Sequence, residues 1–204
     1  MSIVKLNNNG VKNVTAFGSI SSGAMTFIKK LTASSSSTLS FVDGSSDVVL
    51  DNTYKEYIFT FKNIHPATNN THLMVNFRDG GSDYDATKTT SVFYAYHDEA
   101  DSDTSLSYQG GSDLAQSTSA QRLTGGTGNV ADESASGTLH LFNPSSTTFV
   151  KHFISRSSTY NHSNYVNDWY VGGYCNVTAA IDGVQFSMSS GNIDAGDICL
   201  YGIN

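Results

Sequence analysis

Tyr54–Ile64 reads YKEYIFTFKNI, and the order of large and small side chains in this stretch decides the fold. Aromatic residues take every second position, at Tyr57, Phe59 and Phe61. Successive side chains of a β-strand point to opposite faces, so the aromatic set lies on one side of a strand. The stretch therefore predicts a strand with one buried aromatic face, which we expect to end at His65-Pro66.

The same alternation continues outward along the chain. One face is apolar in HLMVNF (Leu73, Val75, Phe77), TLHLF (Leu139, Leu141) and VQFSMS (Val184, Phe186, Met188). Further strands are expected in Ala24–Ala33, Thr38–Val42, Ser91–Tyr96, TTFVKHFI, YVGGYCNVTA and DICLYGI. About ten short strands separated by turn residues are typical of an antiparallel sandwich or jelly roll.

Local details sharpen this picture. Bulky residues on both sides of Ser91–Tyr96 predict a central strand. In TTFVKHFI, Phe149 is expected to share a face with Lys151 and Phe153. Gly172-Gly173 indicates a kink or bulge. VQFSMS and DICLYGI are expected to form a hairpin.

The composition supports an all-β chain. Charged residues make up 14% of it, and Ser, Thr and Asn together supply about a third. These polar residues and the aromatic ones are weak helix formers. We therefore predict an all-β fold, an antiparallel jelly-roll-like β-sandwich over residues 23–204, preceded by an extended N-terminal arm over residues 1–22.

The longest irregular region is predicted between His97 and Ser136. It contains one possible short helix, Asp113–Leu123, and the Gly-rich stretch Gly125–Asn129. That stretch lacks the G-K-[ST] ending of a phosphate loop, so it is interpreted as a mobile or interfacial surface loop. A loop of this length in a compact domain is usually functional or interfacial.

Charge and apolar runs exclude several classes of protein. The net charge of −7 argues against nucleic-acid binding, which needs a basic surface. No apolar run is long enough to span a bilayer, and MSIVKLNNNG has no signal-peptide core. The chain is thus expected to be made in a cytoplasm. Cys175 and Cys199 are expected to be buried free thiols.

The sequence offers no enzyme motif. It lacks the G-x-S-x-G elbow of serine hydrolases, and Glu is confined to Glu56, Glu99 and Glu133. It also lacks H-x-x-x-H and C-x-x-C, so we expect no enzyme activity, no metal and no cofactor. Calcium stays an alternative at two acidic loops, which contain Asp79, Asp83 and Asp85, and Asp98, Asp101 and Asp103.

One aromatic segment is a candidate binding surface. Ser155–Tyr174 contains Tyr160, Tyr165, Trp169, Tyr170 and Tyr174 among Asn and Asp residues. Tyr and Trp present an apolar ring face and a polar tip, which suits stacking on sugars. The same residues suit a protein interface or packing within the fold, and these readings stay open at this point.

A series of motifs gives a family resemblance. FTFKNIHPAT, DGGSDYD, GTLHLFNPSS, FVKHF and QFSMSSGNIDAGDICLYGI follow one another between about Tyr54 and Ile203. In this order they resemble a family of structural proteins of marine cyanophages and related marine phages. The resemblance implies a tail-fibre or other virion-surface protein with a jelly-roll-like domain, assembled as a homo-oligomer such as a trimer, and it lends no catalytic residues.

The first hypothesis is therefore a non-enzymatic virion structural protein. It would be a surface appendage, fibre or capsid-decoration subunit, located in the virion after assembly in a host cytoplasm. Its partners would be other virion proteins and copies of itself, with no nucleic acid and no membrane insertion. The alternative is a receptor-recognition module of a tail fibre that binds host surface glycan through the aromatic segment.

Overall fold

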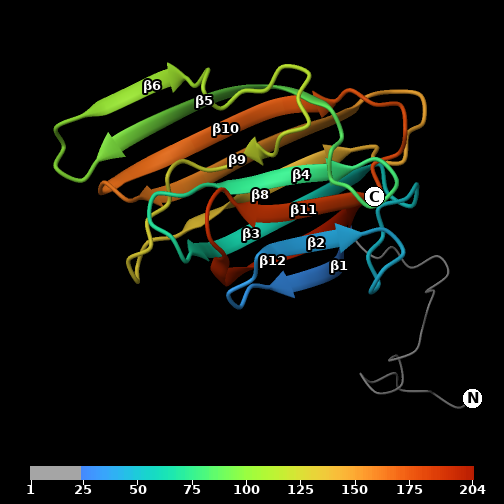
Figure 1. Cartoon of the computed structure of the whole chain (residues 1–204), viewed down its shortest axis with the longest axis horizontal. Helices are drawn as coiled ribbons and strands as arrows, with labels where there is room; N and C mark the ends of the chain where they lie inside the picture. The colour runs from blue at the N-terminus through green and yellow to red at the C-terminus, as the bar shows by residue number, and fades with distance from the viewer. Residues whose placement is uncertain (1–23) are drawn as a thin grey trace, which may run out of the picture.

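The computed structural model describes residues 24–204, and within this range the chain forms twelve strands and no helix. Two antiparallel sheets pack face to face in a sandwich-like arrangement (Figure 1). The predictions of an all-β class and of two antiparallel layers are confirmed, whereas jelly-roll connectivity stays a prediction. The predicted arm, residues 1–22, lies outside the described residues.

The two sheets differ in width. The larger sheet contains, in spatial order, β1 (Met25–Thr32), β12 (Ile193–Ile203), β3 (Glu56–Pro66), β8 (Ala135–Phe142), β9 (Lys151–Asn161), β10 (Tyr165–Cys175), β5 (Lys88–Asp98) and β6 (Thr104–Tyr108). The smaller sheet contains β2 (Thr38–Val42), β11 (Gly183–Met188), β4 (Leu73–Arg78) and β7 (Gln121–Arg122). The four strands of the smaller sheet cannot cover the whole inner face of the eight-stranded sheet.

The core fills the space between the sheets, as the alternation in β3 predicts. Tyr57, Phe59 and Phe61 are fully buried on its inner face. The Phe59 ring lies 5.3 Å from that of Phe41 on β2 and 5.5 Å from that of Phe186 on β11, measured between centroids. The predicted apolar faces of β4, β8 and β11 are also buried, so a period of two identifies the core correctly in all four strands.

The chain between β6 and β8, residues 109–134, runs across the inner face of the larger sheet (Figure 1). Its backbone bonds to β5, where the Thr90 N–H donates to the Leu114 carbonyl oxygen. Over β9, the Ser157 hydroxyl donates to the Leu123 carbonyl oxygen at 2.6 Å. The predicted irregular region thus includes two short strands, β6 and β7, and the predicted helix at Asp113–Leu123 is wrong.

Other local predictions are also wrong. Ser91–Tyr96 lies in β5, next to the edge strand β6 rather than at the centre, whereas β3 ends at Pro66 as expected. β11 and β12 belong to different sheets, so they form no hairpin. Phe149 precedes β9 and is 70% exposed, because regular pairing begins only at Lys151.

The Gly172-Gly173 pair makes no kink. β10 pairs with β5 and with β9 in unbroken register through both residues. At Gly173, an added Cβ would lie 2.8 Å from the Thr89 carbonyl oxygen and 2.5 Å from the Thr90 Cγ2. At Gly172, the nearest atom would be 3.9 Å away. Close packing against β5 therefore explains the glycine at position 173, and the predicted bulge is absent.

Candidate functional site

The candidate site lies where the small sheet ends. Its edge strand β7 stops over β9, and the inner face of β10, β5 and β6 extends beyond it. A cavity of about 180 Å³ lies beside the edge strand β7. It is bounded by β10 and β5 on one side and by β7 and the Gly-rich segment on the other. No strand of the small sheet follows β7, so the aromatic residues of the inner face can line an opening.

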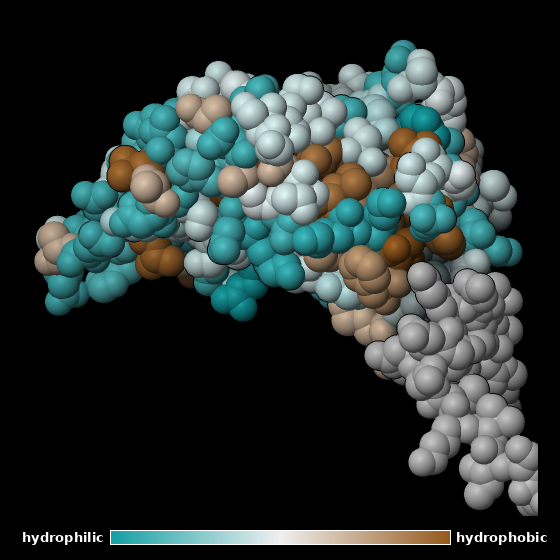
Figure 2. Space-filling view, turned by 90° about the horizontal axis from the view of Figure 1, so that it is seen from below, coloured by the Kyte–Doolittle hydropathy of each residue, from teal (hydrophilic) through white to brown (hydrophobic). Residues whose placement is uncertain are grey.

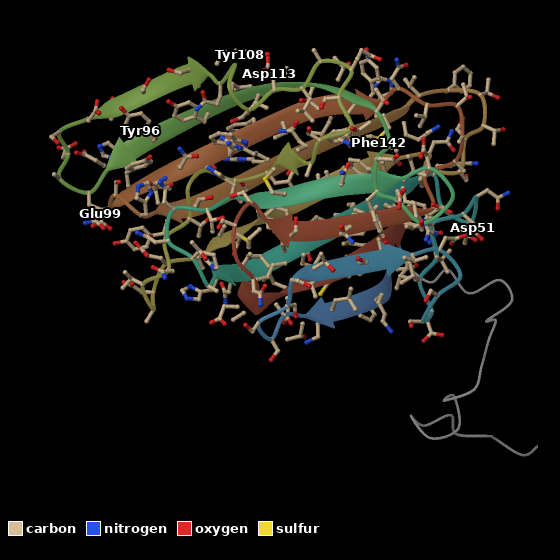
Figure 3. The ribbon with its side chains drawn as sticks, viewed as in Figure 1. Asp51, Tyr96, Glu99, Tyr108, Asp113 and Phe142 are labelled. Carbon is tan, nitrogen blue, oxygen red and sulfur yellow. The ribbon has the colours of Figure 1, made fainter. Side chains whose placement is uncertain are left out.

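Three aromatic rings, those of Trp169, Tyr94 and Tyr165, line the cavity, and the Tyr96 ring contacts two of them from outside it. We call these four residues the aromatic ledge. Trp169 pairs with Tyr94 across β10 and β5, and their rings stack with centroids 5.6 Å apart at 24°. Tyr94 and Tyr96 lie 6.1 Å apart at 14°, and Tyr96 lies 5.1 Å from Tyr165. Trp169 is 3% exposed, whereas the three tyrosines are half-buried, so the ledge runs from the core to the free end of β5, where Tyr96 lies (Figure 3).

Two buried polar atoms of the cavity residues have no hydrogen-bond partner. They are the Trp169 Nε1 and the Asn167 Oδ1, one a donor and the other an acceptor. Both residues are 3% exposed and both line the cavity. Leaving such a group unpaired costs about 1–3 kcal/mol, so buried polar atoms are normally satisfied by protein, water or ligand. Both unpaired atoms thus belong to residues of the cavity wall.

The Gly-rich segment forms the opposite wall. Gly125 and Gly126 are buried, so the prediction of a surface loop is wrong. An added Cβ at Gly125 would lie 2.8 Å from the Asn167 Oδ1, and one at Gly126 would overlap the Asn70 Oδ1. The absence of side chains here lets the backbone approach the cavity residues closely.

Three nitrogen-bearing side chains complete the lining: His72 from the start of β4, Arg122 from β7, and His162 from the β9–β10 turn. The His72 Nδ1 lies 3.1 Å from the Thr124 carbonyl oxygen. Burial, and then the positive charge of Arg122, lower the pKa of His72 below its ordinary value. His72 is therefore neutral at pH 7.

The structure divides the five predicted binding residues between two faces of the sheet. Tyr165 and Trp169 belong to the inner cavity, where Trp169 is also part of the core. Tyr170 points outward and stacks on Phe93 at 4.6 Å and 4°, with the Arg156 guanidinium 5.1 Å from its ring centre. Tyr160 and Tyr174 also occupy strand positions that face outward, and the Tyr174 ring contacts His152. A segment of consecutive strand residues cannot form one aromatic surface, because neighbours alternate.

Several residues of the cavity carried no signal that would single them out. Tyr94 and Tyr96 could have been found from SVFYAY, had the inner face of that strand been recognised as partly uncovered. His72, Arg122, Asn70 and the two glycines come from segments far apart in the sequence. Their proximity depends on where the small sheet ends, which no local pattern encodes.

The acidic loops are engaged in local bonds. The Asp98 carboxylate accepts from the backbone N–H of Ser102 at 2.8 Å and of Asp103 at 3.0 Å. The Tyr96 hydroxyl donates to Asp103 at 2.6 Å. Across residues 24–204, no three His, Cys, Asp or Glu side chains gather in a way that could hold a metal ion. The same range contains no helix able to span a membrane.

The geometry is that of a small cavity with an aromatic floor and unpaired polar groups. Comparison of the chain with protein-family models, with curated proteins and with solved structures found no significant match.

Proposed function

We propose that this chain is a sugar-binding protein of a virion surface. One observation carries the proposal: Trp169 and Asn167, whose Nε1 and Oδ1 have no hydrogen-bond partner, line a small cavity beside stacked aromatic rings. The virion location rests on the family resemblance alone. The proposal places glycan recognition, the alternative considered from the sequence, ahead of a purely structural role.

A sugar matches the lining better than an apolar ligand does. Aromatic rings supply faces for the C–H groups of a pyranose, and hydroxyl groups both donate and accept hydrogen bonds. The cavity offers an indole donor, an amide acceptor and further amides from Asn70 and Asn161. Its volume of about 180 Å³ lies below the roughly 300–1,000 Å³ typical of drug-sized sites, which suits a single sugar ring. The tyrosines of the ledge would extend the contact to a second ring.

The proposal is of binding rather than hydrolysis. Glycoside hydrolases place two carboxyl groups on either side of the scissile bond. Of the residues described at this cavity, none is Asp or Glu. The lining therefore supplies recognition without a general acid or a nucleophile.

A glycan array, followed by titration with the methyl glycosides of its hits, tests this function. The chain has one Trp, so its fluorescence reports directly on the cavity. Trp169→Phe keeps an aromatic ring but removes Nε1, and Asn167→Leu removes the amide. Each is expected to weaken binding about three- to tenfold, the value of one hydrogen bond. Trp169→Ala is less informative, since emptying the site costs about 3–5 kcal/mol of stability.

Tyr170→Ala is the matched control, because Tyr170 adjoins Trp169 on the same strand but faces outward. It should leave the affinity unchanged. Since Trp169→Phe removes the reporter, variants are compared by saturation-transfer NMR. If no array glycan binds, or if Tyr170→Ala weakens binding as much as Trp169→Phe does, the cavity is not the sugar site.

A second candidate function is structural assembly, favoured by the outer face of the larger sheet. A cross-strand row of largely uncharged side chains crosses five strands there: Phe27, Tyr201, Ile58, His140 and Ile154. Phe27 and Ile154 are each 56% exposed. Figure 2, which shows the molecule from below, also has apolar residues among polar ones on that side. The resemblance to oligomeric virion proteins names a second copy of this chain as the occupant.

A further inference from the structure

We propose that the sugar bound in this cavity carries a negative charge, as a carboxylate or a sulfate ester. This inference rests on the proposed sugar-binding function and narrows its ligand class. It is drawn from Arg122, the charged side chain among the described lining residues, whose sign is opposite to the net charge of the chain.

Arg122 supplies the first observation. The chain has three arginines, and two of them are neutralised: Arg78 lies 2.8 Å from Asp182, and Arg156 lies 2.9 Å from Asp168. Within the described part of the chain, Arg122 forms no ion pair, and its Nη1 donates only to the Ser112 hydroxyl at 3.2 Å. The guanidinium has five N–H donors, so most of its capacity is left for a ligand.

The fold holds Arg122 at the cavity. The neighbouring Gln121 is fully buried, and its amide donates to the Ser112 and Arg122 carbonyl oxygens at 3.0 and 2.8 Å. Its Oε1 accepts from the Thr90 hydroxyl on β5 at 2.6 Å. A backbone fixed between the two sheets keeps the guanidinium beside the ledge, which reduces the entropy lost when it binds an anion.

The two histidines supply the second observation. The Nδ1 atoms of His72 and His162 lie 3.1 and 3.3 Å from the carbonyl oxygens of Thr124 and Gly126. A carbonyl oxygen only accepts, so each Nδ1 carries the hydrogen and donates it to the backbone. Both imidazoles are thereby held beside Arg122 by the backbone.

The sign of the charge is local. The whole chain has a net charge of −7, yet Arg122 lines a cavity to which the described residues contribute no carboxylate. Arg binds carboxylate and sulfate groups through charge-assisted hydrogen bonds, which are about twice as strong as neutral ones. An acidic sugar would pair Arg122 while its ring lies against the ledge.

The test compares matched sugars on the full chain: methyl glucoside, methyl glucuronide and methyl glucoside 6-sulfate, with inorganic sulfate as the free anion. Tryptophan fluorescence and saturation-transfer NMR give the affinities. At least one acidic sugar should bind roughly tenfold more tightly than methyl glucoside. Adding 0.5 M NaCl should reduce that preference.

Arg122→Gln should remove most of the preference, so that the ratio of the acidic-sugar affinity to the methyl glucoside affinity falls toward one. Arg156→Gln is the matched control, because it removes a guanidinium from the outer face, and it should preserve the preference. Arg122→Lys, which keeps the charge but loses the planar donor geometry, should retain part of it. The comparison of sugars on the unaltered chain does not depend on whether any variant folds.

The outcomes separate the two proposals. Equal binding of neutral and acidic glucosides overturns the anionic ligand and leaves sugar binding intact. Inorganic sulfate that binds as tightly as the acidic sugars, with no gain from the ring, also overturns it. If none of the glucosides binds and the array shows no hit, the sugar-binding function itself fails.

Discussion

At the scale of single residues, Cys175 shows how the inner face accommodates polar groups away from the cavity. It pairs with Lys88 on β5 and with Lys151 on β9, and all three side chains are buried. Each lysine donates to loop carbonyl oxygens, among them Ala86 for Lys88 and Val177 for Lys151. Burial raises the pKa of the Cys175 thiol to about 12, and the two ammonium groups offset only part of this effect.

The Cys175 thiol should therefore be unreactive in the native protein. At pH 8 only about one thiol in 10⁴ would be ionised, and the thiolate is the nucleophile. In a Cys199→Ser variant, Ellman's reagent should label no thiol under native conditions and one after unfolding in guanidinium chloride. Rapid native labelling would show that β10 opens or that Cys175 is accessible.

At the scale of elements, the strand β10 separates two surfaces. Its inward residues reach the core and the cavity, whereas Tyr170 and Tyr174 face outward. Gly172 and Gly173, near the end of β10, also lie on opposite faces. A Cβ at Gly173 would overlap the β5 backbone, whereas at Gly172 the nearest atom would be the Ser91 Oγ at 3.9 Å.

Substituting each glycine by alanine should separate close packing from flexibility. Gly173→Ala is expected to destabilise the fold by about 1–3 kcal/mol, because the new methyl group overlaps Thr89 and Thr90. Gly172→Ala should be neutral or stabilising by up to about 1 kcal/mol, since Gly weakens a strand interior. Urea unfolding followed by Trp169 fluorescence measures both. Equal losses in the two variants would argue against this packing.

The sequence predicts the strands better than it predicts the site. Alternation in β3, β4, β8 and β11 identifies the buried side chains, because a period of two leaves one choice of inner face. It does not identify which strands pair, so β11 and β12 were expected to be neighbours. The site was found in part, through Trp169 and Tyr165. Arg122 and Gly125 were missed, because the edge of the small sheet brings them to β10 from another part of the chain.

At the scale of the whole molecule, the exposed row on the outer face predicts self-association. Light scattering after size-exclusion chromatography should show an oligomer, with a trimer favoured by the resemblance. Ile154→Glu places a charge at the β9 end of the row, in one of its two most exposed apolar positions, and should convert the oligomer to a monomer. Ile154 is 56% exposed, so the fold itself should tolerate the change.

Phe149→Glu is the control for this prediction, because Phe149 is 70% exposed but lies outside the row, before β9. It should leave the molar mass unchanged. An unaltered chain that stays monomeric at high micromolar concentration would contradict the assembly. So would an Ile154→Glu variant with undiminished molar mass.

The unequal width of the two sheets has a consequence for how such a protein could diversify. The mouth of the cavity is built by residues 109–134, which pack on the frame of eight strands without forming its central ladder. Insertions and deletions in the exposed part of this segment, residues 129–132, cost little, because the entropy of loop closure grows slowly with length. Changes in this segment would thus alter the ligand specificity of the cavity, while the outer face of the larger sheet, where neighbouring copies would pack, stays the same.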